Sequence, residues 1–185
     1  MARRLRYQVA VSLDGFIAGK DGDYDWIIMD PAIDFAALFS AFDTAVMGRK
    51  TYEVVTRDGH MGMMGGMQCV VFSRTLLPVD QPGLRIVADD PAEVVRHLKA
   101  QPGKDIWLYG GDQLFRTLLT AGLVDTVELA VIPVLLWEGV PLLPPGQRSV
   151  LELCDHKVLS SGTVILAYKV PGGAGAAPTI HWVHG

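Results

Sequence analysis

The chain has 185 residues, of which 50% are hydrophobic and 19% are charged, and its formal net charge is −4. These values fit one globular domain over residues 1–170 and argue against a protein that neutralises nucleic-acid phosphates. Cys69 and Cys154 are too few for a disulfide framework, which favours a cytoplasmic location. We expect neither a secretory signal nor a membrane span, since the most apolar stretch, Leu129–Trp137, is too short to cross a bilayer.

The first part of the chain alternates strand and helix patterns. A helix is predicted over 31–42, because Asp30 is placed to cap it and Pro31 suits the first helical position. The other elements expected here are a strand at Tyr7–Val11 that runs into a turn at Asp14-Gly15, a strand at Thr44–Gly48 and a helix at Arg49–Val55.

Residues 59–67 are rich in Met and Gly and fit neither a helix nor a strand pattern. Methionine adapts its shape readily to an apolar ligand. The segment is therefore interpreted either as a flexible lid over a ligand or as a mobile connection without a role.

The second part continues the alternation. A helix over 90–101 has strong signals, since Asp90 and Glu93 have capping-box spacing and Pro91 suits the first turn. Residues 171–185, rich in Gly, Ala and Pro, predict a flexible tail. The strands expected in this part are Gln68–Phe72, Leu84–Val87, Val124–Leu136 and one within Val158–Val170.

Strands that alternate with helices at this spacing predict an α/β sheet with helices on both faces, whose ligands bind beyond the carboxyl ends of the strands. One such end lies in the segment 105–115, where an apolar strand stops at Gly110-Gly111 and a helix begins. The first N–H groups of a helix have no partner within it, and glycine lets an anion approach them closely. The alternative is a plain turn whose glycines serve only the backbone shape.

A second junction, at residues 45–53, repeats this arrangement with more positive charge. Gly48 permits close approach, Thr51 and the helical N–H groups can hold a phosphate, and Arg49 and Lys50 add cations. A third strand end supplies Ser73 and Arg74. Three such ends can bind a ligand with several phosphates, and arginine commonly accommodates the 2′-phosphate of NADP.

Three motifs occur in a characteristic order: residues 47–53 (MGRKTYE), 72–74 (FSR) and 108–111 (LYGG). In this order and spacing they resemble the dihydrofolate reductase superfamily over Tyr7 to Val170. Residues 12–15 (SLDG), 123–125 (LVD) and 132–136 (IPVLL) look most like the branch related to the C-terminal reductase domain of riboflavin-biosynthesis deaminase-reductases.

This resemblance implies a mostly parallel central sheet with an antiparallel closing strand, an NADPH site, and hydride transfer to a flat nitrogen heterocycle. Members of the riboflavin branch are commonly dimers, so we expect a homodimer. The resemblance assigns the cofactor phosphates to Gly48, Arg49, Lys50 and Thr51, the surroundings of the 2′-phosphate to Ser73 and Arg74, the pyrophosphate turn to Gly110, Gly111, Asp112, Gln113 and Leu114, and the flanks of the nicotinamide to Ala10 and Ile17.

The chain also departs from the riboflavin-pathway pattern. Those reductases carry a Glu before the paired glycines, where this chain has Tyr109, and an Asp-x-Pro-x-Leu segment where it has the Met/Gly segment. Both features serve the phosphoribosyl-pyrimidine substrate or its setting in that family. Their absence argues against that particular substrate.

Two carboxylates are candidates for catalysis. Asp34 falls near the place where dihydrofolate reductases hold the pterin with a carboxylate, and there it would share a proton with a ring nitrogen. The alternative is that Asp34 only complements a helix dipole in solvent. Asp14 is a second candidate, with the alternative that it is a turn residue.

The sequence therefore predicts an NADPH-dependent reductase with a dihydrofolate-reductase-like fold, acting on a pterin-like, pyrimidine or riboflavin-precursor-like heterocycle. Covalent catalysis is not expected, and no metal ligand set is predicted. Two alternatives remain open. One is a catalytically silent NADP-binding dimer that acts as a sensor or interaction module, and the other is a flavin-binding reductase that uses the same pocket.

Overall fold

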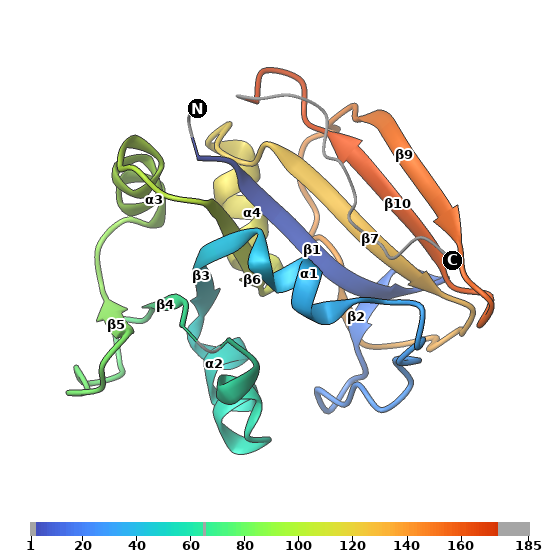
Figure 1. Ribbon diagram of the computed structural model, residues 1–185, viewed down its shortest axis with the longest axis horizontal. Helices are drawn as coiled ribbons and strands as arrows, with labels where there is room; N and C mark the ends of the chain where they lie inside the picture. Colours follow the sequence, from blue (N-terminus) through green and yellow to red (C-terminus); the bar gives the residue numbers. More distant parts are fainter. Residues whose placement is uncertain (1–2, 65, 174–185) are drawn as a thin grey trace.

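An eight-stranded sheet forms the centre of the protein, as shown by the computed structural model, which describes residues 3–64 and 66–173 (Figure 1). Its strand order is β5-β4-β3-β6-β1-β7-β10-β9. Neighbours from β5 to β7 are parallel, whereas β10 is antiparallel to both β7 and β9, which confirms the predicted mostly parallel sheet. The strands are β1 (Leu5–Ser12), β3 (Phe42–Gly48), β4 (Gln68–Phe72), β5 (Leu84–Val87), β6 (Asp105–Gly110), β7 (Thr126–Ile132), β9 (Glu152–Val158) and β10 (Val164–Lys169).

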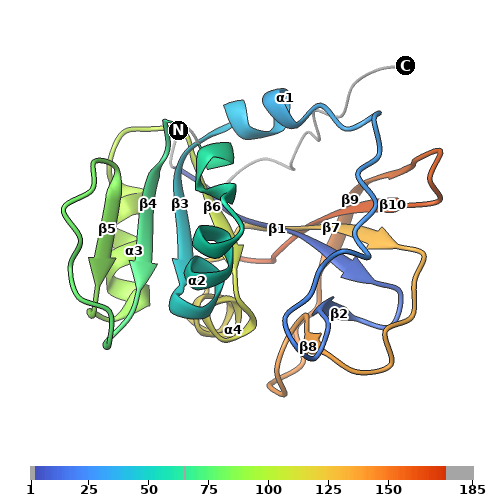
Figure 2. The same cartoon turned by 90° about the horizontal axis from the view of Figure 1, so that it is seen from below.

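Three strands are not expected from the sequence pattern. β2 (Phe16–Ala18) and β8 (Val140–Pro141) pair in a small antiparallel sheet of their own, beside the main sheet (Figure 2). Both are too short to show a periodicity. β9 is an edge strand whose residues are mostly exposed, so it has no buried face and no apolar alternation to reveal it.

Helices cover both faces of the sheet, as predicted. α1 and α2 lie on one face and α3 and α4 on the other (Figure 1). None of the helices within the described ranges is long and apolar enough to cross a membrane. The helices are α1 (Phe35–Ser40), α2 (Arg49–Arg57), α3 (Pro91–Ala100) and α4 (Asp112–Thr120), together with a single 3-10 turn, η1 (His60–Met64).

The larger part of the core lies between the sheet and the α3–α4 layer. Leu114, Phe115 and Leu118 of α4 share one face of the helix and are buried against β1 and β6. The ring of Phe115 stacks on that of Tyr7 in β1, with 3.9 Å between ring centroids. This apolar contact fixes α4 on the sheet, and the start of α4 is thereby held at the carboxyl end of β6.

The expected helix over 31–42 is shorter in the structure. It begins at Phe35 because Asp34 is the N-cap, with its Oδ1 accepting a hydrogen bond from the backbone N–H of Ala37 at 2.9 Å. Asp30, the expected cap, instead accepts from the N–H of Ala32 at 2.8 Å and from that of Ser161 at 3.0 Å. The carboxylate of Asp30 therefore ties this segment to the β9–β10 turn, and it is not available to the helix.

The strand expected over 124–136 is shorter as well. β7 ends at Ile132, since the next residue, Pro133, has no N–H to continue the ladder. By contrast, α3 begins as predicted, because Asp90 accepts hydrogen bonds from the N–H groups of Ala92 and Glu93. The predicted tail lies outside the described residues from residue 174 onward.

Part of the Met/Gly segment forms a 3-10 helix and contributes to the core. Residues 60–64 form the 3-10 turn, and Met64 and Met67 are buried in the second apolar cluster, with Val55 of α2 and Trp107 of β6. Met64 and Met67 thus fill space under α2. His60 and Met64 also line the cleft described below.

Leu118→Ala is expected to lower the free energy of unfolding by about 2–5 kcal/mol, because it leaves a cavity under α4 where the leucine is fully buried. Urea denaturation of both proteins measures this difference. Leu77→Ala is the matched control, since Leu77 is 81% exposed, and its effect should stay within about 0.5 kcal/mol. Equal losses for the two variants would contradict the placement of α4 in the core.

Candidate functional site

Two strand-to-helix junctions lie side by side at the carboxyl ends of β3 and β6. The strands are parallel neighbours, and Met47 of β3 pairs with Gly110 of β6. α2 and α4 consequently start next to each other, with Gly48 and Gly111 as their N-caps. Neither N-cap makes a side-chain hydrogen bond to its helix. The first N–H groups of two helices therefore face one place and are available to an anion.

Glycines and one threonine keep these junctions close. A Cβ placed on Gly48 would lie 4.0 Å from the backbone nitrogen of Gly111, and one on Gly111 would lie 3.3 Å from Oγ1 of Thr51. Gly110 has a φ of 143°, a conformation that favours glycine, and its peptide bond to Gly111 is cis. Thr51 stands in the first turn of α2 and joins the two junctions. Side chains at the glycines would fill the space that an anion needs.

A cleft of about 1410 Å³ extends from these junctions across the α1–α2 face of the sheet. Its walls come from α1, from the start of α2, from the segment that follows β2 and from β8. Figure 2 shows where these elements lie relative to the sheet. The residues of the sheet that form its floor are Gln8, Val9 and Ala10 of β1, Trp107, Tyr109 and Gly110 of β6, Glu128, Leu129, Ala130 and Ile132 of β7, and Ile165 of β10.

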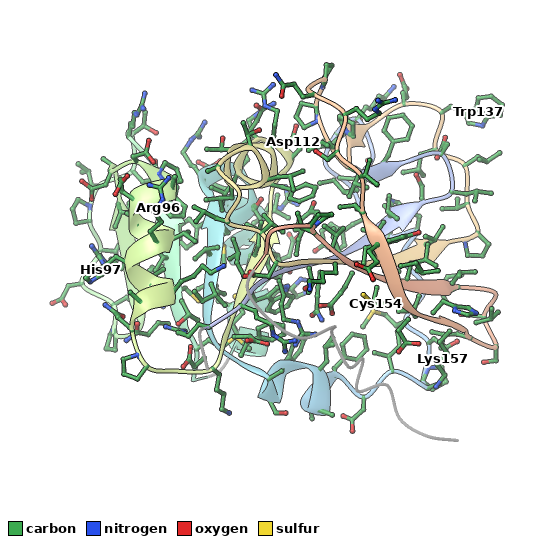
Figure 3. The ribbon with its side chains drawn as sticks, turned by 90° about the horizontal axis from the view of Figure 1, so that it is seen from above. Arg96, His97, Asp112, Trp137, Cys154 and Lys157 are labelled. Carbon is green, nitrogen blue, oxygen red and sulfur yellow. The ribbon has the colours of Figure 1, made fainter. Side chains whose placement is uncertain are left out.

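Most of the residues assigned to a cofactor by resemblance line this one cleft. Asp112 stands at the start of α4, well away from Arg96 and His97 on α3 (Figure 3). The carboxylate of Asp112 places negative charge beside the N-terminus of α4. It therefore repels an anion from the positions next to it. The residues brought together are Ala10, Ile17, Gly48, Arg49, Lys50, Thr51, Gly110, Gly111, Asp112, Gln113 and Leu114.

Ser73 and Arg74 lie next to this group but do not line the cleft. They follow β4, whose last residue, Phe72, pairs with Gly48. The hydroxyl oxygen of Ser73 accepts hydrogen bonds from the backbone N–H groups of Thr75 and Leu76, and the side chain of Arg74 is exposed. A ligand that reaches this strand end must therefore extend outward past Gly48.

The positive charge at the start of α2 is partly balanced. Arg49 forms an ion pair with Glu53 one turn later, at 2.7 Å, and both side chains are more than 40% exposed. Such an exposed pair contributes little to stability. Because its carboxylate partner is on the surface, Arg49 can exchange Glu53 for a ligand phosphate at small cost.

The two candidate catalytic carboxylates are outside the cleft lining. Asp34 is the cap of α1 described above. Asp14 accepts hydrogen bonds from Ser12 Oγ at 2.7 Å and from the N–H of Trp137 at 2.7 Å. Partial desolvation opposes ionisation of Asp14, but these hydrogen bonds, with one from the N–H of Leu136, outweigh it and lower the pKa. In both cases the carboxylate holds backbone groups in place.

Sequence reasoning missed a buried polar group in the floor of the cleft. Glu128 of β7 accepts hydrogen bonds from Arg6 Nε at 2.8 Å and Nη2 at 2.7 Å, from the hydroxyl of Thr126 at 2.8 Å, and from the amide nitrogen of Gln8. Burial acts to lower the pKa of Arg6, but its contacts with Glu128 and with Asp105 outweigh burial and raise it. Polar residues inside two buried parallel strands were the signal that could have revealed this group.

Aromatic side chains form the wall beside this polar group. The indole of Trp107 stacks with Phe39 of α1 at 5.2 Å and meets Tyr109 edge-on at 4.7 Å between ring centroids. The Trp107 indole N–H points to the backbone oxygen of Gln8 at 3.4 Å. Burial raises the pKa of Tyr109, so its hydroxyl stays protonated at neutral pH. The wall is aromatic and apolar, which suits a planar ring.

A contact at the edge of the cleft joins its two sides. The hydroxyl of Tyr24, in the segment after β2, donates a hydrogen bond to Asp58 at the end of α2, and His60 Nδ1 lies 3.5 Å away. Hydrogen bonds from Arg57 and then from Tyr24 lower the pKa of Asp58 to about 2. A lowered carboxyl pKa favours the folded state above the ordinary pKa and loses that contribution only as pH falls through about 2. The contact is therefore retained at neutral and mildly acidic pH.

The sheet order and the paired glycine junctions define a dihydrofolate-reductase-like α/β protein. Residues 3–166 match the RibD C-terminal domain family, and the chain belongs to this family. It is 38% identical over 182 residues to the uncharacterized protein YyaP of Bacillus subtilis, a match that covers 92% of this chain and 96% of YyaP.

Solved structures share this fold. A putative riboflavin biosynthesis protein from Shewanella sp. PV-4 superposes with a TM-score of 0.78 and 26% identity, covering 92% of this chain and 99% of that one. A pyrimidine reductase-like protein from Corynebacterium diphtheriae superposes with a TM-score of 0.67 and 17% identity, covering 91% and 92%. The family is reductase-like, which supports an oxidoreductase.

Glu128→Ala is expected to lower the free energy of unfolding by about 3–5 kcal/mol, because it leaves the buried guanidinium of Arg6 without its main partner. Urea or thermal denaturation measures the loss. The double variant Arg6→Met/Glu128→Leu should recover most of it, since neither charge of the Arg6–Glu128 pair is then left buried without its partner.

Glu53→Ala serves as the control for this experiment, because it breaks an exposed ion pair and should cost less than about 1 kcal/mol. A loss for Glu128→Ala no larger than that of the control would show that Arg6 does not depend on Glu128.

Proposed function

We propose that the protein is an NADPH-dependent reductase that transfers a hydride to a small nitrogen heterocycle, either pterin-like, pyrimidine or riboflavin-precursor-like. One observation carries the proposal: two helices without side-chain caps start side by side at the end of a large cleft whose wall is aromatic and whose floor is mostly apolar. A ligand with a pyrophosphate at one end and a planar ring at the other fits such a site. Membership of a reductase-like family supports it.

The residues present fit the cofactor. The N–H groups at the starts of α2 and α4 would hold the pyrophosphate, Gly48, Gly110 and Gly111 would allow its close approach, and Arg49 and Lys50 would balance its charge. Arg74, past the end of β4, would contact the 2′-phosphate. When bound, the cofactor supplies the hydride. The floor at Ala10 and the nearby Ile17 would set the plane of its ring.

The chain's own contribution to the reaction is positioning and exclusion of water. The aromatic wall at Trp107 and Phe39 would hold the substrate ring parallel to the sheet and over the cofactor ring. Among the described residues, those that line the cleft from β1, β7, β10 and α1 include no Lys or Arg, and the cations of the lining, Lys20, Arg49, Lys50 and Arg57, come from other segments. This favours an uncharged ring over a phosphoribosyl substrate at that end of the cleft.

Arg49→Ala is expected to weaken NADPH binding about three- to tenfold, because it removes one exposed charge-assisted hydrogen bond to the cofactor. Arg74→Ala should weaken NADPH binding to a similar extent and leave NADH binding unchanged, because only NADPH carries the 2′-phosphate. Nicotinamide fluorescence during titration measures both affinities.

Arg96→Ala is the matched control, since Arg96 lies on α3 away from the cleft (Figure 3), and it should bind NADPH as the original protein does. The cofactor assignment fails if the original protein does not bind NADPH, or if the control loses as much affinity as Arg49→Ala.

Turnover is tested by following NADPH absorbance with a panel of pterins, pyrimidines, flavins and quinones. We expect NADPH oxidation with at least one uncharged pterin or pyrimidine. Saturable NADPH binding without oxidation by any compound of the panel would instead support the catalytically silent binding module, and a yellow purified protein would point to a bound flavin.

A further inference from the structure

The amide of Gln8 is fixed in the floor of the cleft. Its nitrogen donates a hydrogen bond to Oε2 of Glu128, which pairs with it across the β1–β7 ladder. The carboxylate is itself held by the guanidinium of Arg6 and the hydroxyl of Thr126, and it is only 3% exposed. A carboxylate accepts hydrogen bonds and cannot donate them, so the amide nitrogen of Gln8, not its oxygen, must face Glu128.

The orientation of the nitrogen leaves the carbonyl oxygen of Gln8 without a partner. This Oε1 atom is buried and makes no hydrogen bond within the described part of the protein. Gln8 as a whole is only 9% exposed. An unpaired buried acceptor is uncommon and costs stability, because it has lost its hydrogen bonds to water. Gln8 lines the cleft, and a ligand donor bound against this side chain would supply the partner that the oxygen lacks.

Small side chains leave room for a ligand beside Gln8. Ala10 follows it on the same face of β1, and Ala130 pairs with Ala10 across the ladder to β7. Trp107, which stacks with Phe39, bounds the same region and binds the backbone of Gln8 through its indole N–H. At this point the floor is therefore an apolar surface with small side chains, and the carbonyl oxygen of Gln8 is a fixed hydrogen-bond acceptor within it.

We infer that Gln8 is a substrate-binding residue that selects flat, uncharged heterocycles carrying a ring lactam N–H or an amino group, which donates a hydrogen bond to the Gln8 carbonyl oxygen. The inference rests on the proposed function, because it places the substrate in the same cleft as NADPH. Glu128 and Arg6 are positioning residues, since they act only by holding the Gln8 amide. A ring without a donor leaves the acceptor unpaired and binds less well.

Calorimetric titration of the NADP⁺-saturated protein tests this selectivity, because NADP⁺ fills the cofactor site without donating a hydride. The probes are the pteridine-dione lumazine and its N,N-dimethyl derivative, in which methyl groups replace both lactam hydrogens. The original protein should bind lumazine about tenfold more tightly, the value of one hydrogen bond to a buried acceptor. Gln8→Met, which keeps the length of the side chain and removes the acceptor, should reduce this preference to less than about twofold.

Gln8→Leu provides a second variant without the acceptor if Gln8→Met does not fold, as judged by circular dichroism. Thr163→Val is the matched control: it removes a different polar group from the cleft lining, a hydroxyl that contacts Ser161, and it should keep the full preference for lumazine.

The inference is overturned if the NADP⁺-saturated original protein binds the two rings equally or binds neither, or if the preference survives in the Gln8 variants. NADPH titration of the same proteins separates this result from failure of the proposed function. A protein that binds NADPH without discriminating between the rings refutes the role of Gln8 alone, whereas one that does not bind NADPH refutes both.

Discussion

The parallel pairing of β3 with β6 is the constraint on which the site depends. It brings Met47 opposite Gly110, and the next residues along each chain are the caps of α2 and α4. Each helix start alone would be an ordinary connection, but two at one place concentrate unsatisfied N–H groups and positive dipole ends. The core under α4, with Phe115 stacked on Tyr7, keeps one helix in position, and Val55 in the second apolar cluster keeps the other.

The same sheet supplies two chemically different ends to one cleft. At the carboxyl ends of β3 and β6 the backbone provides donors and Arg49 provides charge. Over β1 and β7 the floor offers alanines, an aromatic wall and the polar group of Arg6, Gln8 and Glu128. A ligand with an anionic part and a planar part matches these two ends together, which supports the proposal that the cleft holds a dinucleotide and a small ring side by side.

The sequence predicts the junctions well and the floor poorly, for a physical reason. Gly48, Gly110 and Gly111 are visible because a strand, a glycine and a helix leave local patterns in the chain. Gln8 and Glu128 are far apart in sequence, and their contact arises only when β1 and β7 pair. Asp14 and Asp34 are visible in the sequence, but their contacts are not. A carboxylate near a turn has the same local sequence whether it binds backbone N–H groups or a substrate. Only the tertiary structure places their hydrogen bonds.

The exposed edge of β9 also bears on how this protein behaves at high concentration. β9 pairs with β10 on one side and is the last strand of the sheet in the described residues, so its outer backbone groups can recruit a strand from another molecule. Leu153 and Val158 are more than half exposed there, and these apolar side chains would favour such strand pairing. The strand carries charges of both signs, negative at Glu152 and Asp155 and positive at Lys157. A strand that pairs with this edge must therefore carry charges in a complementary order. Open-ended growth into fibrils is thereby disfavoured, while a single complementary pairing is not.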